Sequence, residues 1–277
     1  MPELPEVETV RRVLNEELSG LEIKDIDIRY PNIIEDDIDY FKNNVINKKI
    51  VGLDRLGKHL IFLFNDGAML SHLRMEGKFF YVNPDFEINK HIHVIFHLSN
   101  GKLLCYQDVR KFGRFCYREN KELYTTPPLV NVGVDLTKNN NPNINELYKK
   151  ITNKRIPIKT TLLDQSIIAG LGNIYVDEVL YESHINPNRA SNLVSIGDVS
   201  NIVLNSEKIF NNAILNKGTT IRSYTSSLGV IGNYQNFLKV HTKTECPCCK
   251  NTLIRVKIGG RMTYFCEKCQ RWLWWRK

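Results

Sequence analysis

The sequence of 277 residues predicts a multidomain α+β protein. Alternating apolar residues with hairpin signals run through residues 21–120, apolar residues at helical spacing run through 144–217, and two cysteine pairs follow near the C-terminus. These shifts in pattern divide the chain into successive segments. We expect a β-rich N-terminal domain at 1–124, a linker at 125–143, a helical domain at 144–238 and a cysteine module at 239–277.

The first element expected is a helix that begins almost at the chain terminus. Pro5 suits the first turn of a helix because its missing N–H would have no partner there, and Glu6 and Glu8 suit the positive end of the helix dipole. Gly20 closes the segment. The apolar residues of this segment recur at helical spacing: Val7, Val10, Leu14 and Leu18. A terminus tied into a helix is held in place, whereas chain ends are commonly loose.

Residues 21–120 are expected to form antiparallel strands. The stretch LEIKDIDIRY alternates between apolar and polar residues, as a half-buried strand does. Asp66-Gly67 and Asn100-Gly101 separate apolar runs and are strong hairpin signals. We therefore expect a sandwich of two antiparallel sheets, flanked by helices, with Cys105 and Cys116 as buried core thiols.

The second half of the chain is expected to be helical. Residues 125–143, rich in Pro, Asn and Gly, separate it from the strands. Helices are predicted at 144–153, 160–170, 173–185 and 198–216. Residues 217–234 are rich in Gly, Ser, Thr and Tyr and are too polar to pack as core. Both an ordered functional loop and a disordered segment fit that composition.

Four cysteines near the C-terminus have the spacing of a structural zinc site. Each C-x2-C pair can bend into a knuckle that presents two sulfurs to one metal ion, and two knuckles complete a tetrahedral shell. The predicted ligands of one structural Zn2+ ion are Cys246, Cys249, Cys266 and Cys269. Cys248 adjoins this set and could compete, but the two-residue spacing favours Cys246. Because four thiolates close the shell, this zinc ion would shape the module without taking part in chemistry.

Positive charge is concentrated in the same module. The formal net charge is +8, and residues 239–277 carry ten Lys or Arg against two Glu, whereas the rest of the chain is balanced. A folded basic block favours a polyanion partner, and a solvated basic tail is the plainer alternative. Between the cysteine pairs a hairpin is expected to turn at Gly259-Gly260 and to present Arg261. Since no apolar run reaches the length of a membrane span, we expect a soluble, cytoplasmic protein.

The chain terminus is a candidate nucleophile. Initiator methionine is commonly removed before a small residue, which would leave Pro2 with a free secondary amine. An α-amine titrates at about pH 8, well below lysine, so more of it is neutral and nucleophilic at physiological pH. Attack of this amine on a sugar C1′ would give a cationic iminium, and Glu3 and Glu6 could transfer protons beside it. Taken alone, such a start is weak evidence for catalysis.

Further motifs occur with this start in one order: RLGKHLIF, HLRMEGKF, QDVRKFGRF, LDQSIIAGLGNIYVDEVLY and the four-cysteine hairpin. In this combination the chain resembles the bacterial formamidopyrimidine-DNA glycosylase family over essentially its whole length. That family removes oxidised purines from DNA and then cuts the strand. The related endonuclease VIII branch, which acts on oxidised pyrimidines, begins PEGPEI instead of PELPEV and is a weaker match.

The resemblance implies catalytic roles for residues that match its motifs. Pro2 would be the nucleophile that displaces the damaged base and forms a Schiff base. Glu3 would be the acid that helps to open the sugar ring, and Glu6 would help to order the amine. Lys58, in a turn between two strands, would contact the lesion strand and its phosphates.

The resemblance also implies a DNA-binding surface. Met75, Arg110 and Phe112 would fill the space that the flipped nucleotide leaves in the duplex. The helical domain would contain a helix–two-turns–helix module in which Asn173 binds a phosphate, and Arg261 would reach the same phosphates from the zinc hairpin. Further phosphate contacts are implied for His72 and Lys159. The loop over the flipped base would be lined by Thr219, Thr220, Arg222 and Tyr224.

Together these expectations describe a bifunctional enzyme that binds damaged double-stranded DNA as a monomer, in the bacterial cytoplasm and at the nucleoid. It would excise 8-oxoguanine and formamidopyrimidines and cleave the abasic strand by β,δ-elimination, with structural zinc as the cofactor. Two alternatives remain open: an endonuclease VIII-type glycosylase, and a non-catalytic DNA-binding protein of the same fold, which a retained Met1 would favour. A second metal site at His91, His93 and His97 is disfavoured, because one strand face does not close a ligand shell.

Overall fold

The computed structural model describes residues 1–138, 141–219 and 232–270. The chain divides into two compact units: Met1–Val130 with Lys217–Gly232, and Asn131–Asn216 with Asn233–Lys277. The helical segment and the cysteine module, which the sequence pattern separates, thus share one unit, and the segment that follows residue 216 groups with the N-terminal unit. None of the helices in the described parts of the chain combines the length and the apolar character needed to span a lipid bilayer.

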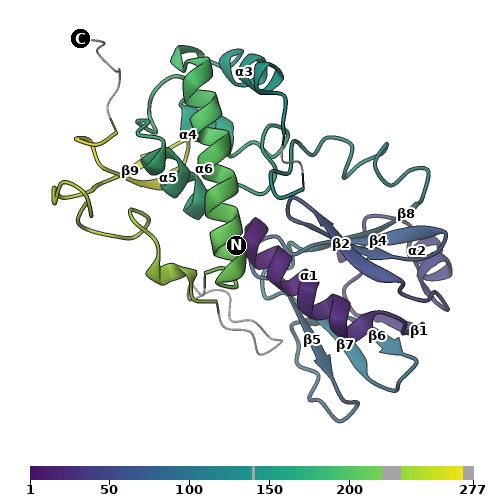
Figure 1. The fold of residues 1–277 in the computed structure, drawn as a ribbon. Helices are drawn as coiled ribbons and strands as arrows, with labels where there is room; N and C mark the ends of the chain where they lie inside the picture. The colour runs from purple at the N-terminus through teal and green to yellow at the C-terminus, as the bar shows by residue number, and fades with distance from the viewer. Residues whose placement is uncertain (139–140, 220–231, 271–277) are drawn as a thin grey trace. The chain divides into compact units, whose positions relative to one another are not determined.

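The first unit is built on two four-stranded antiparallel sheets (Figure 1). One sheet has the order β1-β6-β7-β5, with β1 (Ile23–Ile28), β6 (Ile92–Leu98), β7 (Leu103–Gln107) and β5 (Lys78–Val82). The other has the order β2-β3-β4-β8, with β2 (Gly52–Leu56), β3 (His59–Leu63), β4 (Gly67–His72) and β8 (Arg114–Glu119). The expected pair of antiparallel sheets is confirmed.

Both sheets contribute to one hydrophobic core, which accounts for the alternating sequence pattern. Its members from the two sheets include Phe62, Met69, Phe96 and Leu104. The predicted turns form where expected, since β3 and β4 are joined through Asp66-Gly67 and β6 and β7 through Asn100-Gly101. Cys105 and Cys116 are buried, as predicted, and burial raises the pKa of the Cys105 thiol to about 11.

Two α-helices lie among the described residues of this unit. The first, α1 (Leu4–Leu18), buries the apolar stripe that predicts it. The second, α2 (Ile38–Val45), is missing from the prediction, which assigns its region to strands. The side chain of Asp37 accepts the N–H of Tyr40 at 2.9 Å and so caps α2, and Phe41 anchors the helix in the core. A helix of eight residues gives only a short periodic pattern, and the surrounding strand signals obscure it.

The second unit holds four α-helices among its described residues: α3 (Ile144–Thr152), α4 (Ile158–Leu162), α5 (Asn173–Glu182) and α6 (Ile196–Leu215). Short 3-10 helices complete the list: η1 (Pro31–Ile33) in the first unit, and η2 (Ser191–Leu193) and η3 (Tyr234–Asn236) in the second. The prediction extends the helix of α4 to residue 170, which is wrong. The side chain of Gln165 donates to the Leu171 carbonyl and accepts the N–H of Gly170, so side-chain bonds replace helical ones there.

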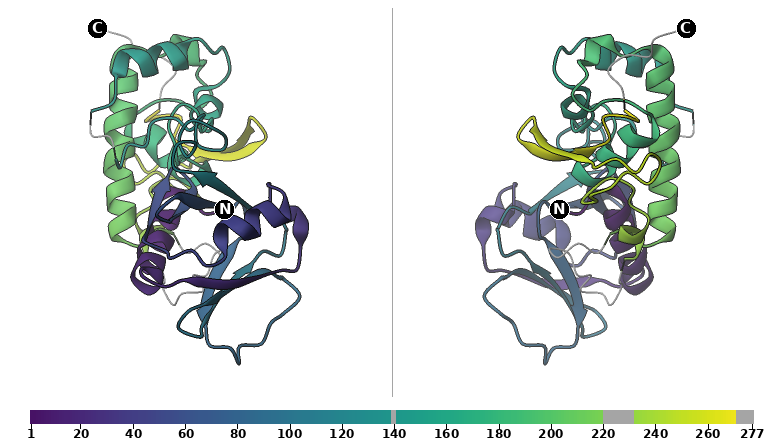
Figure 2. Two further views of the ribbon diagram at one scale, coloured as in Figure 1. Left: turned by 90° about the vertical axis from the view of Figure 1, so that its right-hand side faces the viewer. Right: turned by 90° about the vertical axis from the view of Figure 1, so that its left-hand side faces the viewer.

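The cysteine module contains a two-stranded hairpin (Figure 2, yellow). Its strands β9 (Ile254–Ile258) and β10 (Arg261–Phe265) pair antiparallel, with Arg261 opposite Ile258. The chain therefore turns at Gly259-Gly260, as predicted. Both glycines have positive φ, 55° and 76°, which is the backbone that a two-residue hairpin turn of this kind requires.

A buried charge cluster ties α1 to β2. Glu8 accepts hydrogen bonds from Arg11 and Arg12 on its own helix and from Arg55 of β2, whose side chain is almost fully buried. Burial alone raises the pKa of Glu8, but the hydrogen bonds from Arg11 and Arg12 and the charge of Arg55 outweigh it and lower the pKa to about 2. The folded state thus favours the ionised carboxylate.

We expect Glu8→Gln to destabilise the first unit, because it removes the negative charge that accepts from the buried Arg55 guanidinium. The loss at neutral pH should be about 3 kcal/mol in the free energy of unfolding. Since the folded pKa of Glu8 is depressed, its contribution is full above the ordinary value of 4.5 and is lost as the pH falls towards 2. In Glu8→Gln the free energy of unfolding should therefore fall less steeply between pH 4.5 and pH 2 than in the wild type. Denaturant unfolding at several pH values measures this dependence.

The matched control is Glu17→Gln, which neutralises an exposed glutamate on the same helix. It should unfold like the wild type at every pH. Equal unfolding curves for the two variants would contradict the assigned role of Glu8.

Candidate active site and nucleic-acid interface

The chain terminus lies in a buried, charged environment at the start of α1. Pro2 is buried, and Glu3, Glu6 and Lys58 are only 2 %, 2 % and 5 % exposed. Lys58 occupies the turn between β2 and β3. Burial lowers the pKa of the terminal amine of Met1, the negative charges of Glu3 and Glu6 oppose this, and the positive charge of Lys58 adds to it, for a net lowering. The four predicted catalytic residues therefore gather around the chain terminus.

Glu6 joins this terminus to a distant segment of the same unit. Its Oε2 accepts the N–H of Glu3 at 2.9 Å. Its Oε1 accepts the N–H of Thr219 at 2.7 Å and the Thr219 hydroxyl at 3.0 Å. Thr219, predicted to line the loop over the flipped base, is thus bonded to a predicted catalytic residue. The other predicted loop residues lie outside the described residues: Thr220, Arg222 and Tyr224.

Two turns carry the residues predicted to enter the duplex. The β4–β5 turn (residues 73–77) carries Met75, which is half-buried. The β7–β8 turn (residues 108–113) carries Arg110 and Phe112, which are both exposed. The Arg110 guanidinium lies over the Phe112 ring at 4.9 Å from its centroid. These two side chains therefore form one stacked, exposed pair in which a cation covers an apolar surface.

A buried aspartate organises the β7–β8 turn. Asp108 is 0 % exposed, and its Oδ1 accepts the N–H of Arg110 at 3.0 Å. Its Oδ2 accepts the N–H groups of Phe112 and Gly113 at 2.9 and 2.7 Å. Three backbone donors thus fix the turn around one carboxylate. The sequence prediction omits Asp108, although an aspartate two residues before an exposed turn residue is a known turn signal.

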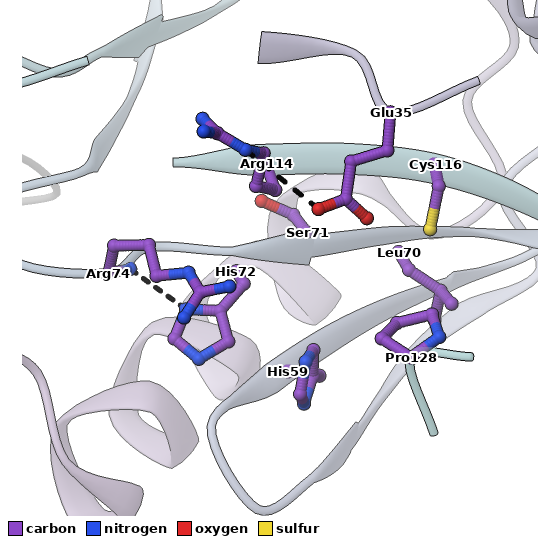
Figure 3. Close-up of a pocket in the computed structure, with 9 residues that line it drawn as sticks. All are labelled: Glu35, His59, Leu70, Ser71, His72, Arg74, Arg114, Cys116 and Pro128. Atoms are coloured by element: carbon purple, nitrogen blue, oxygen red, sulfur yellow. Dashed lines mark hydrogen bonds and ion pairs between the residues drawn. The ribbon is translucent and has the colours of Figure 1, made fainter. Parts of the chain in front are cut away.

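His72 accepts a backbone N–H and so helps to fix the β4–β5 turn (Figure 3), as Asp108 does in the β7–β8 turn. Its Nδ1 accepts the N–H of Arg74 at 2.9 Å, so the neutral ring carries its hydrogen on Nε2. The rings of His59 and His72 meet edge to face, 4.7 Å apart. Burial lowers the pKa of His59 to about 4 and holds the pKa of His72 well below its usual value, helped by the charges of Arg74 and Lys58. A neutral His72 can offer its Nε2–H as a hydrogen-bond donor.

In the second unit, Asn173 and Arg261 are connected through the hairpin. Asn173 is the first residue of α5, and its Nδ2 donates to the carbonyl of Met262 at 2.9 Å. Arg261 precedes Met262 as the first residue of β10 and is exposed. The structure therefore holds an exposed arginine next to a helix N-terminus, where backbone N–H groups and the dipole favour anions.

The Lys159 side chain does not lie at the surface, where the predicted phosphate contact would place it. Its side chain is 0 % exposed, and its Nζ lies 2.8 Å from Asp177 Oδ1, 2.9 Å from Thr263 Oγ1 and 3.1 Å from the Met262 carbonyl. An ammonium enclosed by three protein acceptors does not reach a phosphate at the surface. Lys159 instead ties α4 and α5 to the hairpin that presents Arg261.

The predicted metal ligands form a compact cluster. The sulfurs of Cys246, Cys249, Cys266 and Cys269 all lie within 4.8 Å of one another. The distances are 3.8 Å between Cys246 and Cys269 and 3.4 Å between Cys249 and Cys266. A tetrahedral zinc ion with Zn–S bonds of about 2.3 Å needs sulfurs about 3.8 Å apart, so the cluster fits a closed four-thiolate site. Cys248 is exposed and lies outside the cluster.

The histidines of β6 are held by hydrogen bonds. His93 is buried, with its Nε2 2.8 Å from the Asp108 carbonyl, and the Nε2 of His97 lies 2.9 Å from Asp27 Oδ2. In the described residues, no group of potential metal ligands includes them or His91.

Comparison with known proteins agrees with this arrangement. Residues 1–115 match the formamidopyrimidine-DNA glycosylase N-terminal domain, and residues 132–225 match the formamidopyrimidine-DNA glycosylase H2TH domain. The formamidopyrimidine-DNA glycosylase of Lactobacillus gasseri is 43% identical over 98% of this chain and 99% of its own.

Two solved structures are similar over 98% of this chain and all of theirs, each with a TM-score of 0.90 and 36% identity. One is Lactococcus lactis Fpg (MutM) in complex with DNA that contains N7-benzyl-Fapy-dG, and the other is MutM in complex with DNA that contains carbocyclic 8-oxo-G. Full-length identity of this order together with both family domains establishes the relationship: the chain belongs to the formamidopyrimidine-DNA glycosylase family of bifunctional glycosylases and abasic-site lyases.

Proposed function

We propose that this protein excises oxidised purines from double-stranded DNA and then cleaves the abasic strand, with the amine of Pro2 as the nucleophile after removal of Met1. The observation that carries the proposal is the set of groups around the chain terminus. Burial lowers the pKa of the Met1 terminal amine, and Glu3, Glu6 and Lys58 lie close to it, so removal of Met1 would leave the Pro2 amine beside the same groups. A lowered pKa leaves more of the amine neutral, and only the neutral amine can attack carbon.

The reaction would proceed through a covalent intermediate. The Pro2 nitrogen bonds to C1′ as the bond to the base breaks, and the base leaves with the electron pair and takes up a proton. The nitrogen loses its proton, Glu3 protonates O4′, and the C1′–O4′ bond opens to give an iminium. Loss of a C2′ proton then expels the 3′ phosphate, and a second elimination expels the 5′ phosphate. The strand is left with phosphates on both sides of a one-nucleotide gap.

The base must leave the duplex before C1′ can react, at a cost of a few kcal/mol. Met75 and the stacked pair of Arg110 and Phe112 suit the task of filling the space that remains, because an apolar surface replaces base stacking and a guanidinium can bond to the orphaned base. The backbones of both turns are fixed by side-chain acceptors, so the positions from which these side chains project are fixed.

Phosphate contacts would come from both units. In the first unit, Lys58 supplies a charge and the neutral His72 supplies an Nε2–H donor. In the second unit, Asn173 and Arg261 offer an amide and a guanidinium at the N-terminus of α5. Such contacts position the strand without reading its sequence, and they make binding sensitive to salt.

The four-cysteine cluster would hold one structural Zn2+ ion, bound by Cys246, Cys249, Cys266 and Cys269. A zinc ion in such a closed shell stabilises the fold of its module and leaves no position for substrate. Its role is therefore to keep the hairpin, and with it Arg261, in place.

Oxidised purines are the favoured substrates because similar proteins were solved with N7-benzyl-Fapy-dG or carbocyclic 8-oxo-G in their DNA. Initial excision rates should be compared on matched duplexes that contain 8-oxoguanine or thymine glycol. We expect the 8-oxoguanine duplex to be cleaved faster. Faster cleavage of the thymine-glycol duplex would instead assign the protein to oxidised pyrimidines.

Borohydride reduction should trap the wild-type protein on an 8-oxoguanine duplex, because it converts the iminium into a stable covalent bond. Peptide mapping should place the bond on Pro2. Pro2→Gly and protein that retains Met1, identified by intact mass, should give no adduct. Lys49→Ala, which removes an exposed lysine of the same unit, should trap like the wild type. A strong adduct mapped to Lys58 would overturn the assignment.

Metal analysis should find one equivalent of zinc per chain. Cys266→Ser should abolish stoichiometric zinc and weaken DNA binding, because the hairpin loses a ligand that organises it. Cys248→Ser is the matched control, since this exposed thiol lies outside the cluster, and it should keep its zinc. Loss of zinc from Cys248→Ser with retention in Cys266→Ser would refute the ligand assignment.

A further inference from the structure

The β4–β5 turn and the β7–β8 turn run side by side at one end of the sandwich. Each turn crosses from one sheet to the other, since β4 and β8 belong to one sheet and β5 and β7 to the second. The strands that flank the turns are paired up to their ends, with His72 opposite Arg114 and Lys78 opposite Gln107. The two crossings therefore run in opposite directions between the same two pairs of strands.

Tyr106 lies against both turns. A Cβ atom added to Gly77, which ends the β4–β5 turn, would stand 2.1 Å from the Tyr106 hydroxyl oxygen. A Cβ atom added to Gly113, which ends the β7–β8 turn, would stand 1.8 Å from the same oxygen. Real Cβ contacts are essentially never below 3.0 Å. Neither glycine has positive φ, so the requirement for glycine at these positions is steric.

The ring of Tyr106 is itself fixed in the core. The side chain is 0 % exposed, and its ring centroid lies 5.2 Å from that of Phe79 and 4.8 Å from that of Phe115, both in edge-to-face contact. Phe79 follows Gly77 by two residues, and Phe115 follows Gly113 by two residues. The tyrosine thus packs on the first core residue after each turn as well as on the glycine that closes each turn.

Side-chain acceptors fix each turn internally, but they do not connect the two. His72 acts within the β4–β5 turn and Asp108 within the β7–β8 turn. Tyr106 contacts both, so between the paired strand ends it sets the distance between the segment that carries Met75 and the segment that carries Arg110 and Phe112. A close-packed contact of this kind transmits even small displacements, because protein interiors have little free volume.

We propose that Tyr106 is a positioning residue that holds the two turns at a fixed distance from each other. Gly77 and Gly113 leave the space that its hydroxyl group occupies. Met75 and the pair of Arg110 and Phe112 then enter the duplex in a fixed mutual arrangement. The inference rests on the proposed role of these three side chains in filling the opened duplex. It assigns to Tyr106 no contact with DNA or with the reacting sugar.

Gly113→Ala tests this contact, and a second substitution, Tyr106→Phe, is expected to reverse part of its effect. The added methyl group would stand 1.8 Å from the Tyr106 hydroxyl and 2.7 Å from Cζ, so it must displace the ring or the turn. Tyr106→Phe removes the atom that clashes most and leaves the ring Cζ at 2.7 Å from the added methyl group, so the ring must still move, but less far. At Gly77 the Leu73 carbonyl would still lie 2.6 Å from the added methyl group. Tyr106→Phe should therefore rescue Gly113→Ala and fail to rescue Gly77→Ala.

Two assays distinguish a change in the positions of the turns from unfolding of the protein and from failure of the proposed chemistry. Duplex opening is followed by the fluorescence of 2-aminopurine placed next to 8-oxoguanine, together with the excision rate. Borohydride trapping on a single-stranded abasic oligonucleotide measures the reactivity of the nucleophile alone, because a single strand has no duplex to open. We expect Gly113→Ala to lower duplex opening and excision at least about tenfold while single-strand trapping changes little. The double variant with Tyr106→Phe should recover most of the duplex activity.

Gly52→Ala is the control, because a Cβ atom there meets only Asn15 Oδ1 at an ordinary 3.4 Å, and it should match the wild type. If Gly113→Ala fails to fold, Tyr106→Leu replaces it and should lose duplex excision while single-strand trapping remains. Wild-type duplex opening in a folded Gly113→Ala or Tyr106→Leu protein would overturn the proposal, as would equal losses in both assays or no rescue by Tyr106→Phe. Failure of the wild type to trap at all would instead refute the proposed chemistry.

Discussion

The carboxylate of Glu6 is the group on which the terminal site depends. It is 2 % exposed, and a buried carboxylate is costly unless hydrogen bonds replace its water. Here the N–H of Glu3 and the N–H and hydroxyl of Thr219 supply them. One side chain thus connects the first turn of α1 to a segment 213 residues later, and the chain terminus is held where burial and nearby charges act on its amine.

Buried carboxylates fix two further irregular segments in the same way. Asp108 collects three backbone N–H groups and fixes the turn of Arg110 and Phe112. In the second unit, Glu178 of α5 accepts the N–H groups of three successive residues at 239–241, at 2.8, 3.0 and 2.8 Å, and so fixes the start of the cysteine module. Hydrogen bonds to charged groups are about twice as strong as those between neutral groups, so a single buried carboxylate can order several residues of loop.

The sequence was a reliable guide to the strands, the hairpin turns and the cysteine cluster, whose signals are local, whereas it missed the short helix α2 and the turn acceptor Asp108. Alternation, hairpin dipeptides and cysteine spacing each lie within a few residues, and both sheets, the hairpin and the cysteine cluster follow from them. Contacts between distant residues left no such signal. The burial of Lys159 depends on acceptors 18 and 104 residues away, and the bond from Thr219 to Glu6 on two residues 213 apart. Asp108 could have been found from its turn pattern, whereas the role of Tyr106 depends on glycines that become neighbours only in the folded sheets.

Lys159 and Asp177 make the cysteine hairpin inseparable from α4 and α5. The ammonium depends on the Thr263 hydroxyl and the Met262 carbonyl, and the carboxylate also receives the N–H of Tyr264 and lies 2.8 Å from His241 Nδ1. A hairpin grafted from a relative without the Thr263 hydroxyl would leave the buried ammonium short of one hydrogen-bond acceptor, at a cost of about 1–3 kcal/mol. Chimeras should therefore exchange the two helices and the hairpin as one block, and natural variants of this region are expected to change together.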